Sequence, residues 1–180
     1  MKRKLRRWEI TGFAVTGLLG TLLHFVYEWT GGNRIVAAFS AVNESTWEHM
    51  KLLFVPFLVF AVMEFIVFSE AFRNFFAAKA AGVLSGLAAI PVLFYTLTGM
   101  FGPLPGWVNI MTFFLADALA YFVSYRLMST GRLRGGAMQL AGFALLWLLL
   151  FAFVWCTYRP LHLPLFLDPV SGGYGLARSF

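Results

Sequence analysis

The segment from Asn43 to Lys51 is the densest group of side chains in this sequence that could do chemistry. Two carboxylates, an imidazole, an amide and an amine fall within nine residues, Asn43-Glu44-Ser45-Thr46-Trp47-Glu48-His49-Met50-Lys51. The chain as a whole is 60% hydrophobic and only 12% charged, so these groups stand out. Histidine nitrogen and carboxylate oxygen together suit zinc, manganese or non-haem iron. The segment therefore indicates a site for a divalent metal such as zinc.

Further candidate ligands are expected on the same side of the membrane as this segment. His24 and Glu28 lie four residues apart, so they share one face of a helix. A C-terminal segment adds a histidine and an aspartate. The full set of predicted metal ligands contains every histidine of the chain: His24, Glu28, Glu44, His49, His162 and Asp168. Glu48 is the predicted catalytic residue, as a general base on metal-bound water.

The same residues also have plainer interpretations, and the sequence leaves both open. Ser45 and Glu48 fit a capping box at the start of a helix, in which Glu48 bonds back to the Ser45 backbone N–H. Lys51 fits a partner of Glu48, and His24 with Glu28 fits an ordinary ion pair on a helix surface. On a helix, Glu48 and His49 point about 100° apart, so the two are not expected to bind one ion. No HExxH or paired-cysteine signature is present, so the pattern carries little metal specificity.

A second category of candidates lies inside the apolar stretches. Glu64 and Asp117 are acids at membrane depth, where ionisable groups are costly and usually face the interior of a bundle. The sequence suggests no basic neighbour for either acid inside the membrane. Tyr121 shares a helix face with Asp117 and is a candidate hydrogen-bond partner. Neutral acids bonded across helices and a proton or cation pathway are both compatible with this pattern.

The elements that must position these groups are long apolar helices. A bilayer core of about 30 Å needs roughly 20 apolar residues in a helix. Five segments meet this requirement: 8–29, 50–69, 75–98, 107–128 and 137–158. The sequence therefore predicts an all-α integral membrane bundle in a single transmembrane domain, 1–180, with 159–180 as a tail on the outer face. Segments 35–42 and 161–170 are too short to cross and are expected to be interfacial or re-entrant.

The distribution of positive charge predicts the orientation of the bundle. With the N-terminus inside, ten of the 14 lysines and arginines lie on the cytoplasmic side and four on the outer side. Such a bias favours the N-terminus in and the C-terminus out. The net charge of +6 is thereby explained by membrane topology, and nucleic acid is not an expected partner.

Small residues recur every fourth position in two of the expected helices. Gly12, Thr16 and Gly20 do so in the first, and Gly82 and Gly86 in the third. Such rows let helix backbones approach closely in a bilayer. These rows predict a homodimer, in which two copies of the chain pack through these faces. The other expected partner is the lipid bilayer itself.

Two longer motifs resemble a known family. One runs from His24 through Tyr27-Glu28-Trp29 and continues in Val42-Asn43-Glu44-Ser45-x-Trp47-Glu48-His49-x-Lys51-Leu52. The other is Pro164-Leu165-Phe166-x-Asp168-Pro169-x-x-Gly172-x-Tyr174-Gly175. Both resemble a family of small bacterial multi-pass membrane proteins of unknown function. The resemblance implies a location in the bacterial inner membrane and one functional unit formed by the first motif and the tail, but no activity.

Three hypotheses for function follow, and whether the chain is an enzyme stays open among them. The first is a metal-dependent hydrolase or lipid-modifying enzyme with an outward-facing pocket of His, Glu and Asp. The second is a small transporter or ion-coupled permease that uses Asp117 and Glu64. The third is an assembly or structural partner of other membrane proteins.

Overall fold

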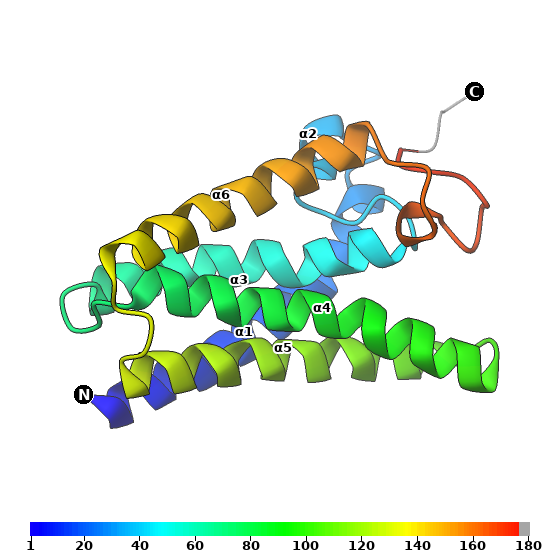
Figure 1. Cartoon of the computed structure of the whole chain (residues 1–180). Coiled ribbons are helices and arrows are strands. Elements are labelled where there is room, and N and C mark those ends of the chain that lie inside the picture. Colours follow the sequence, from blue (N-terminus) through cyan, green and yellow to red (C-terminus); the bar gives the residue numbers. More distant parts are fainter. Residues whose placement is uncertain (177–180) are drawn as a thin grey trace.

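Five long helices form an antiparallel bundle in the computed structural model, which describes residues 1–176 (Figure 1). These are α1 (Lys2–Trp29), α3 (Thr46–Phe68), α4 (Phe75–Phe101), α5 (Gly106–Thr130) and α6 (Gly136–Tyr158). Each is long and apolar enough to cross a membrane. The predicted all-α bundle, with five helices able to cross a membrane, is therefore confirmed, while the orientation of its termini stays a prediction. Its first two crossing helices begin earlier than predicted, because the basic N-terminus and Thr46–His49 are themselves helical.

The bundle has two distinct ends, which we name by what lies there. The N-terminal end contains the start of α1, the α3–α4 turn and the α5–α6 turn (Figure 1). The cavity end contains the end of α1, the α4–α5 turn and the tail after α6. It also contains the short helices α2 (Arg34–Ala37) and η1 (Pro164–Phe166).

Helix α3 lies at the centre of the bundle. It packs against α1, α4 and α6, and more of its length is buried than in any of the other crossing helices of residues 1–176. Pro56 inside α3 has no backbone N–H to donate, so it cannot bond the carbonyl of Leu52 one turn earlier. That carbonyl faces α1, where a Cβ added to Gly20 would lie 2.7 Å from the oxygen. Close approach of α1 to α3 thus depends on a glycine at this position.

The rows of small residues are used inside the chain. A Cβ on Gly12 would lie 2.4 Å from Cε1 of Tyr121, and one on Gly82 would lie 2.7 Å from the carbonyl oxygen of Ala120. Helices α1 and α4 therefore use these faces to pack against α5. The homodimer stays a prediction, and it would have to form through other surfaces.

Substitution of Gly86 should show how much this close packing stabilises the fold. A Cβ there would lie 2.8 Å from the carbonyl oxygen of Ala116, whereas a Cβ on Gly99 of the same helix meets nothing within 4 Å. We expect Gly86→Ala to lower the midpoint of thermal unfolding in detergent. Gly99→Ala should leave it unchanged or raise it, because alanine is favoured over glycine in a helix by about 1 kcal/mol. Equal midpoints for the two variants would contradict the close packing of α4 on α5 at Gly86.

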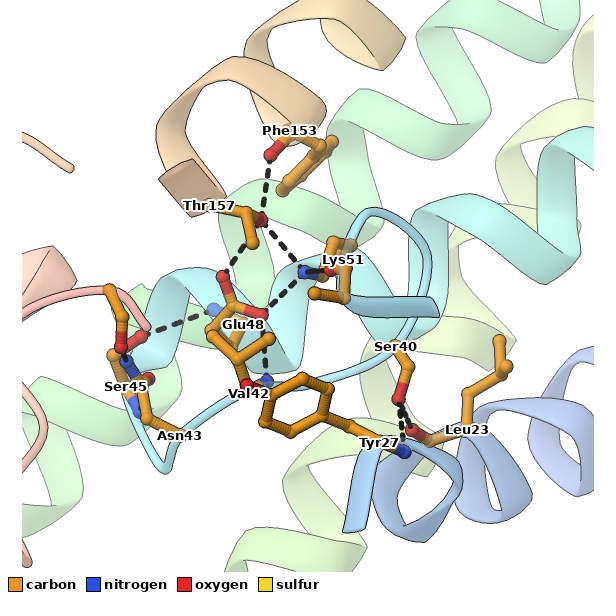
Figure 2. A network of polar contacts seen from close by, with 12 residues as sticks. Leu23, Tyr27, Ser40, Val42, Asn43, Ser45, Glu48, Lys51, Phe153 and Thr157 are labelled. Carbon is orange, nitrogen blue, oxygen red and sulfur yellow. Dashed lines mark hydrogen bonds and ion pairs between the residues drawn. The ribbon is translucent and has the colours of Figure 1, made fainter. Parts of the chain in front are cut away.

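The two short segments that were expected to be interfacial fold against the cavity end. In the first, Ser40 is buried; its hydroxyl donates to the carbonyl of Leu23 at 2.6 Å and accepts from the N–H of Tyr27 at 3.0 Å (Figure 2). In the second, the ring of Phe166 packs on Trp47 with centroids 4.7 Å apart. These contacts tie both segments to the helices that carry the candidate site.

Candidate functional site

Three predicted ligands converge at the cavity end. Nε2 of His24, near the end of α1, lies 3.3 Å from Oε1 of Glu44. Nε2 of His49, in the first turns of α3, lies 3.6 Å from Oε2 of the same carboxylate. One ligand atom from each of the three residues lies within 4.8 Å of the others. Among residues 1–176, no other group of three His, Cys, Asp or Glu side chains comes this close together. The geometry thus brings two imidazoles and a carboxylate to a common point.

Local hydrogen bonds fix the loop and the ring that carry two of these ligands. The side-chain oxygen of Asn43 accepts from the N–H of Ser45 at 2.9 Å, which shapes the turn that holds Glu44. Nδ1 of His49 lies 3.0 Å from the carbonyl oxygen of Ser45. Because a carbonyl only accepts, Nδ1 carries the proton, and the lone pair of a neutral His49 is then on Nε2. Metal-binding histidines are commonly oriented in this way by a carbonyl.

The carboxylate between the two rings is held in its ionised form. The pKa of Glu44 is lowered, chiefly by the hydrogen bond from His24, while burial works in the opposite direction. Glu44 is the most accessible of the three side chains, with 46% of its side chain exposed against 25% for His24 and 28% for His49. The carboxylate oxygens of Glu44 therefore remain partly accessible, although each lies beside a histidine ring.

A cavity of about 310 Å³ opens beside the three residues. It lies between α1 and α5 and reaches down to Gly20 and Leu52, and its lining consists of Gly20, Thr21, His24, Phe25, Glu44, His49, Leu52, Gly106, Asn109, Ile110 and Phe113. A second cavity of about 170 Å³ shares Glu44 and His49 and extends toward Val170 of the tail. Glu44 and His49 thus lie between two hollows whose walls are mostly apolar.

The other three predicted ligands are not part of this group. Asp168 is buried in the tail; burial opposes its ionisation, but hydrogen bonds from Ser171 and from backbone N–H groups, that of Glu44 included, lower its pKa. His162 is exposed and meets the ring of Tyr174 edge to face, with centroids 4.8 Å apart. Glu28 is exposed and forms no ion pair with residues 1–176. Asp168 thus orders the tail beside Glu44.

Glu48 lies in a buried ion pair rather than beside the histidines (Figure 2). Its Oε2 lies 2.6 Å from Nζ of Lys51 and accepts from the N–H of Val42 at 3.2 Å, and its Oε1 accepts from the hydroxyl of Thr157. Only one of the two hydrogen bonds of the capping box is present. Ser45 Oγ accepts from the Glu48 N–H at 3.4 Å, but the Glu48 carboxylate does not return to the Ser45 N–H. The geometry gives no support to Glu48 as a general base, because both of its oxygens already have partners.

A second polar group, at the N-terminal end, includes residues that sequence reasoning missed. Nζ of Lys79 lies 3.0 Å from Oε1 of Glu9 and forms an ion pair with Oε2 of Glu64. The hydroxyl of Ser124 donates to the same Oε1 of Glu9 at 2.8 Å. The expectation that Glu64 has no basic neighbour in the membrane is therefore wrong. Lys79 is one of the ten basic residues that the charge distribution predicts on the cytoplasmic side, but in α4 it is completely buried.

Asp117 and Tyr121 are both buried, yet they do not bond each other. The hydroxyl of Tyr121 lies 2.8 Å from Oγ1 of Thr16 on α1. Neither carboxylate oxygen of Asp117 has a hydrogen-bond partner among residues 1–176. Asp117 is thus an unsatisfied acid in the middle of the bundle, one helical turn from Phe113 of the cavity wall.

Comparisons with known proteins identify the family but no activity. The chain belongs to a family of unknown function, DUF6512, whose sequence profile matches residues 1–176. No curated protein and no solved structure gives a match. Membership in a family of unknown function is thereby confirmed. A bacterial source and a location in the inner membrane stay predictions for this protein.

Proposed function

We propose that this member of the family is a membrane-embedded, metal-dependent hydrolase that acts on a lipid-like substrate. The observation that carries the proposal is the convergence of His24, Glu44 and His49, with ligand atoms within 4.8 Å of one another, on the wall of a cavity. Two histidines and one glutamate form the ligand set of several catalytic zinc sites, in which a fourth position remains for water or substrate. A metal held there would lower the pKa of its bound water and polarise an ester or amide carbonyl.

The form of the cavity supports a substrate with one polar end and one apolar end. Its wall contains Phe25 and Ile110, whose side chains are 43% and 60% exposed on the outer surface of the helices. In a chain that spans a membrane, such apolar surface faces lipid tails. An acyl chain can therefore lie between α1 and α5 while the polar end of the molecule meets the three ligands. With the N-terminus in the cytoplasm of a bacterial cell, this chemistry takes place in the outer half of the inner membrane.

Elemental analysis of the detergent-purified protein tests the metal site. After loading with zinc and removal of the excess, we expect about one zinc ion per chain, as in a single three-ligand site. His24→Ala, His49→Ala and Glu44→Gln should each reduce the zinc content to background. His162→Ala and Glu28→Gln are the matched controls, because they remove the same side-chain types outside the group, and they should retain zinc. A wild-type protein without zinc, or an equal loss in His162→Ala, would reject the site.

The hydrolase itself is tested on the zinc-loaded protein. Phospholipids with cleavable acyl esters, presented in mixed micelles, serve as the substrate probe. We expect turnover that is lost in His49→Ala and retained in His162→Ala. Stoichiometric zinc without turnover on any ester or amide lipid would leave a metal site but reject its role in hydrolysis.

A further inference from the structure

The polar group of Glu9, Glu64, Lys79 and Ser124 is built by four helices. Glu9 comes from α1, Glu64 from α3, Lys79 from α4 and Ser124 from α5. Lys79 and Glu64 are fully buried, and Glu9 is 3% exposed. The rings of Phe57, Phe75 and Tyr121 surround the Lys79 ammonium, at 5.5, 5.8 and 5.5 Å from Nζ to the ring centroids. The group therefore lies in an apolar, water-poor setting.

Charge does not balance in this group when every member is ionised. Two carboxylates meet one ammonium, and no other lysine or arginine of residues 1–176 forms an ion pair with Glu9 or Glu64. The titratable groups that face Lys79 are Glu9, Glu64 and Tyr121, and a phenol adds no positive charge. An uncompensated charge in a protein interior costs several kcal/mol, so such groups neutralise instead. The group must therefore hold one proton more than its fully ionised form.

The hydrogen bonds indicate which carboxylate keeps that proton. Oε1 of Glu9 accepts from both Lys79 and Ser124, and two donors favour an ionised carboxylate. Glu64 has Lys79 as its one partner, without a second donor such as Ser124, and its Oε1, like Oε2 of Glu9, has no partner among residues 1–176. Glu64 is thus the protonated carboxyl group, and Glu9 is the ionised one.

We propose that Glu9, Glu64 and Lys79 form a proton-binding site in the core of the bundle, with one exchangeable proton shared by the two glutamates. This site is separate from the metal site and does not depend on it. It belongs to the class of sites that couple membrane proteins to proton movement, in which buried acids are loaded and unloaded.

Asp117 extends this site toward the cavity end. Phe113, Asp117, Tyr121 and Ser124 follow one another along a single face of α5, at spacings of four, four and three residues. The face leads from the cavity wall at Phe113 to the hydroxyl that donates to Glu9. Because both oxygens of the buried Asp117 lack a partner, it too is protonated, and it is the next proton carrier along α5.

Infrared difference spectroscopy of the reconstituted protein tests the proposal, because the C=O stretch of a protonated carboxyl group is separate from the bands of a carboxylate. At neutral pH, in a sodium-free buffer, we expect protonated-carboxyl bands from Glu64 and Asp117 that shift in deuterated buffer. Asp117→Asn should remove one band and Glu64→Gln the other. The sharpest case is Glu9→Gln, which leaves one ammonium and one carboxylate. The Glu64 band should then be lost although Glu64 itself is still present.

The controls separate charge balance from simple burial. Glu28→Gln, at an exposed position, should leave both bands intact. A Glu64 band that persists in Glu9→Gln would overturn the proposal, since burial alone would then keep the proton on Glu64. Absence of protonated-carboxyl bands from the wild-type protein would overturn it as well. So would a Glu64 band that vanishes when sodium is added, because the site would then take a monovalent cation.

Discussion

Replacement of Lys51 with methionine is expected to destabilise the folded bundle by roughly 3–5 kcal/mol, the usual cost of breaking a buried ion pair by removing one partner. Nζ of Lys51 lies 2.6 Å from Oε2 of Glu48 and donates to the carbonyl of Ala37 and the hydroxyl of Thr157, both at 2.8 Å. Its side chain is fully buried, and that of Glu48 is 2% exposed. The variant keeps most of the side-chain volume but leaves the Glu48 carboxylate without a cation. The destabilisation therefore arises from charge and not from a cavity.

The measurement is the denaturant or thermal midpoint of the protein in detergent micelles. Glu48→Gln/Lys51→Met removes both charges and should recover a large part of the loss, since no unpaired ion remains. Lys4→Met, near the start of α1, is the matched control for loss of a lysine at an exposed position and should have little effect. A double variant as unstable as Lys51→Met alone would show that the pairing with Glu48 is not the cause.

This ion pair also fixes the position of the candidate metal ligands. Glu48 accepts from the N–H of Val42, just before the Glu44 turn, and Lys51 donates to Ala37 at the end of α2. Thr157 ties the pair to α6 (Figure 2). Glu48, which the sequence suggested as a base, thus anchors the loop that presents Glu44 to His24 and His49. We therefore expect Lys51→Met to impair zinc binding as well.

The helices and all three residues of the candidate metal site could be predicted from the sequence, together with three further ligands that the structure does not bring to it. Apolar length is enough to find the five crossing helices, because a bilayer demands it of each segment separately. His49 and Glu44 are close in the chain, and a topology that brings the end of α1 to the same side adds His24. His162 and Asp168 reach the same end, but the path of the tail depends on packing such as that of Phe166 on Trp47. No periodic pattern in the sequence predicts that contact.

The core ion pairs could not be predicted in the same way. Lys79 lies four residues from the start of α4, where a lysine usually extends to the membrane surface. Glu9 follows a run of basic residues and resembles a surface acid. Their pairing depends on α1, α3, α4 and α5 meeting at one level of the bundle, which is a property of the packed fold. The unusual presence of Glu64 in an apolar stretch was the one available signal, since a buried acid requires a partner or a proton.

Acidification is expected to release zinc from the site steeply. A metal binds neutral imidazole, so protons compete with zinc for the two histidine ligands, His24 and His49. In acid the apparent dissociation constant should rise by up to about a hundredfold per pH unit, as two protons replace one ion. Isothermal titration with zinc in detergent, at several pH values, measures this slope. A binding constant independent of pH would contradict a site with two histidine ligands.

Glu44 determines how strongly the three ligands hold together at low pH when no metal is bound. Its pKa is lowered by the hydrogen bond from His24, so its ionised form stabilises the folded state at pH values above the pKa it has in the unfolded chain. That stabilisation is lost as the pH falls through the lowered pKa in the folded state. At pH values above this lowered pKa, Glu44 is a carboxylate that lies against both imidazole rings. Glu44→Gln should remove this hold and weaken zinc binding at every pH, while the slope set by the histidines persists. A loss of slope in Glu44→Gln, with unchanged affinity at high pH, would assign the proton competition to Glu44 instead.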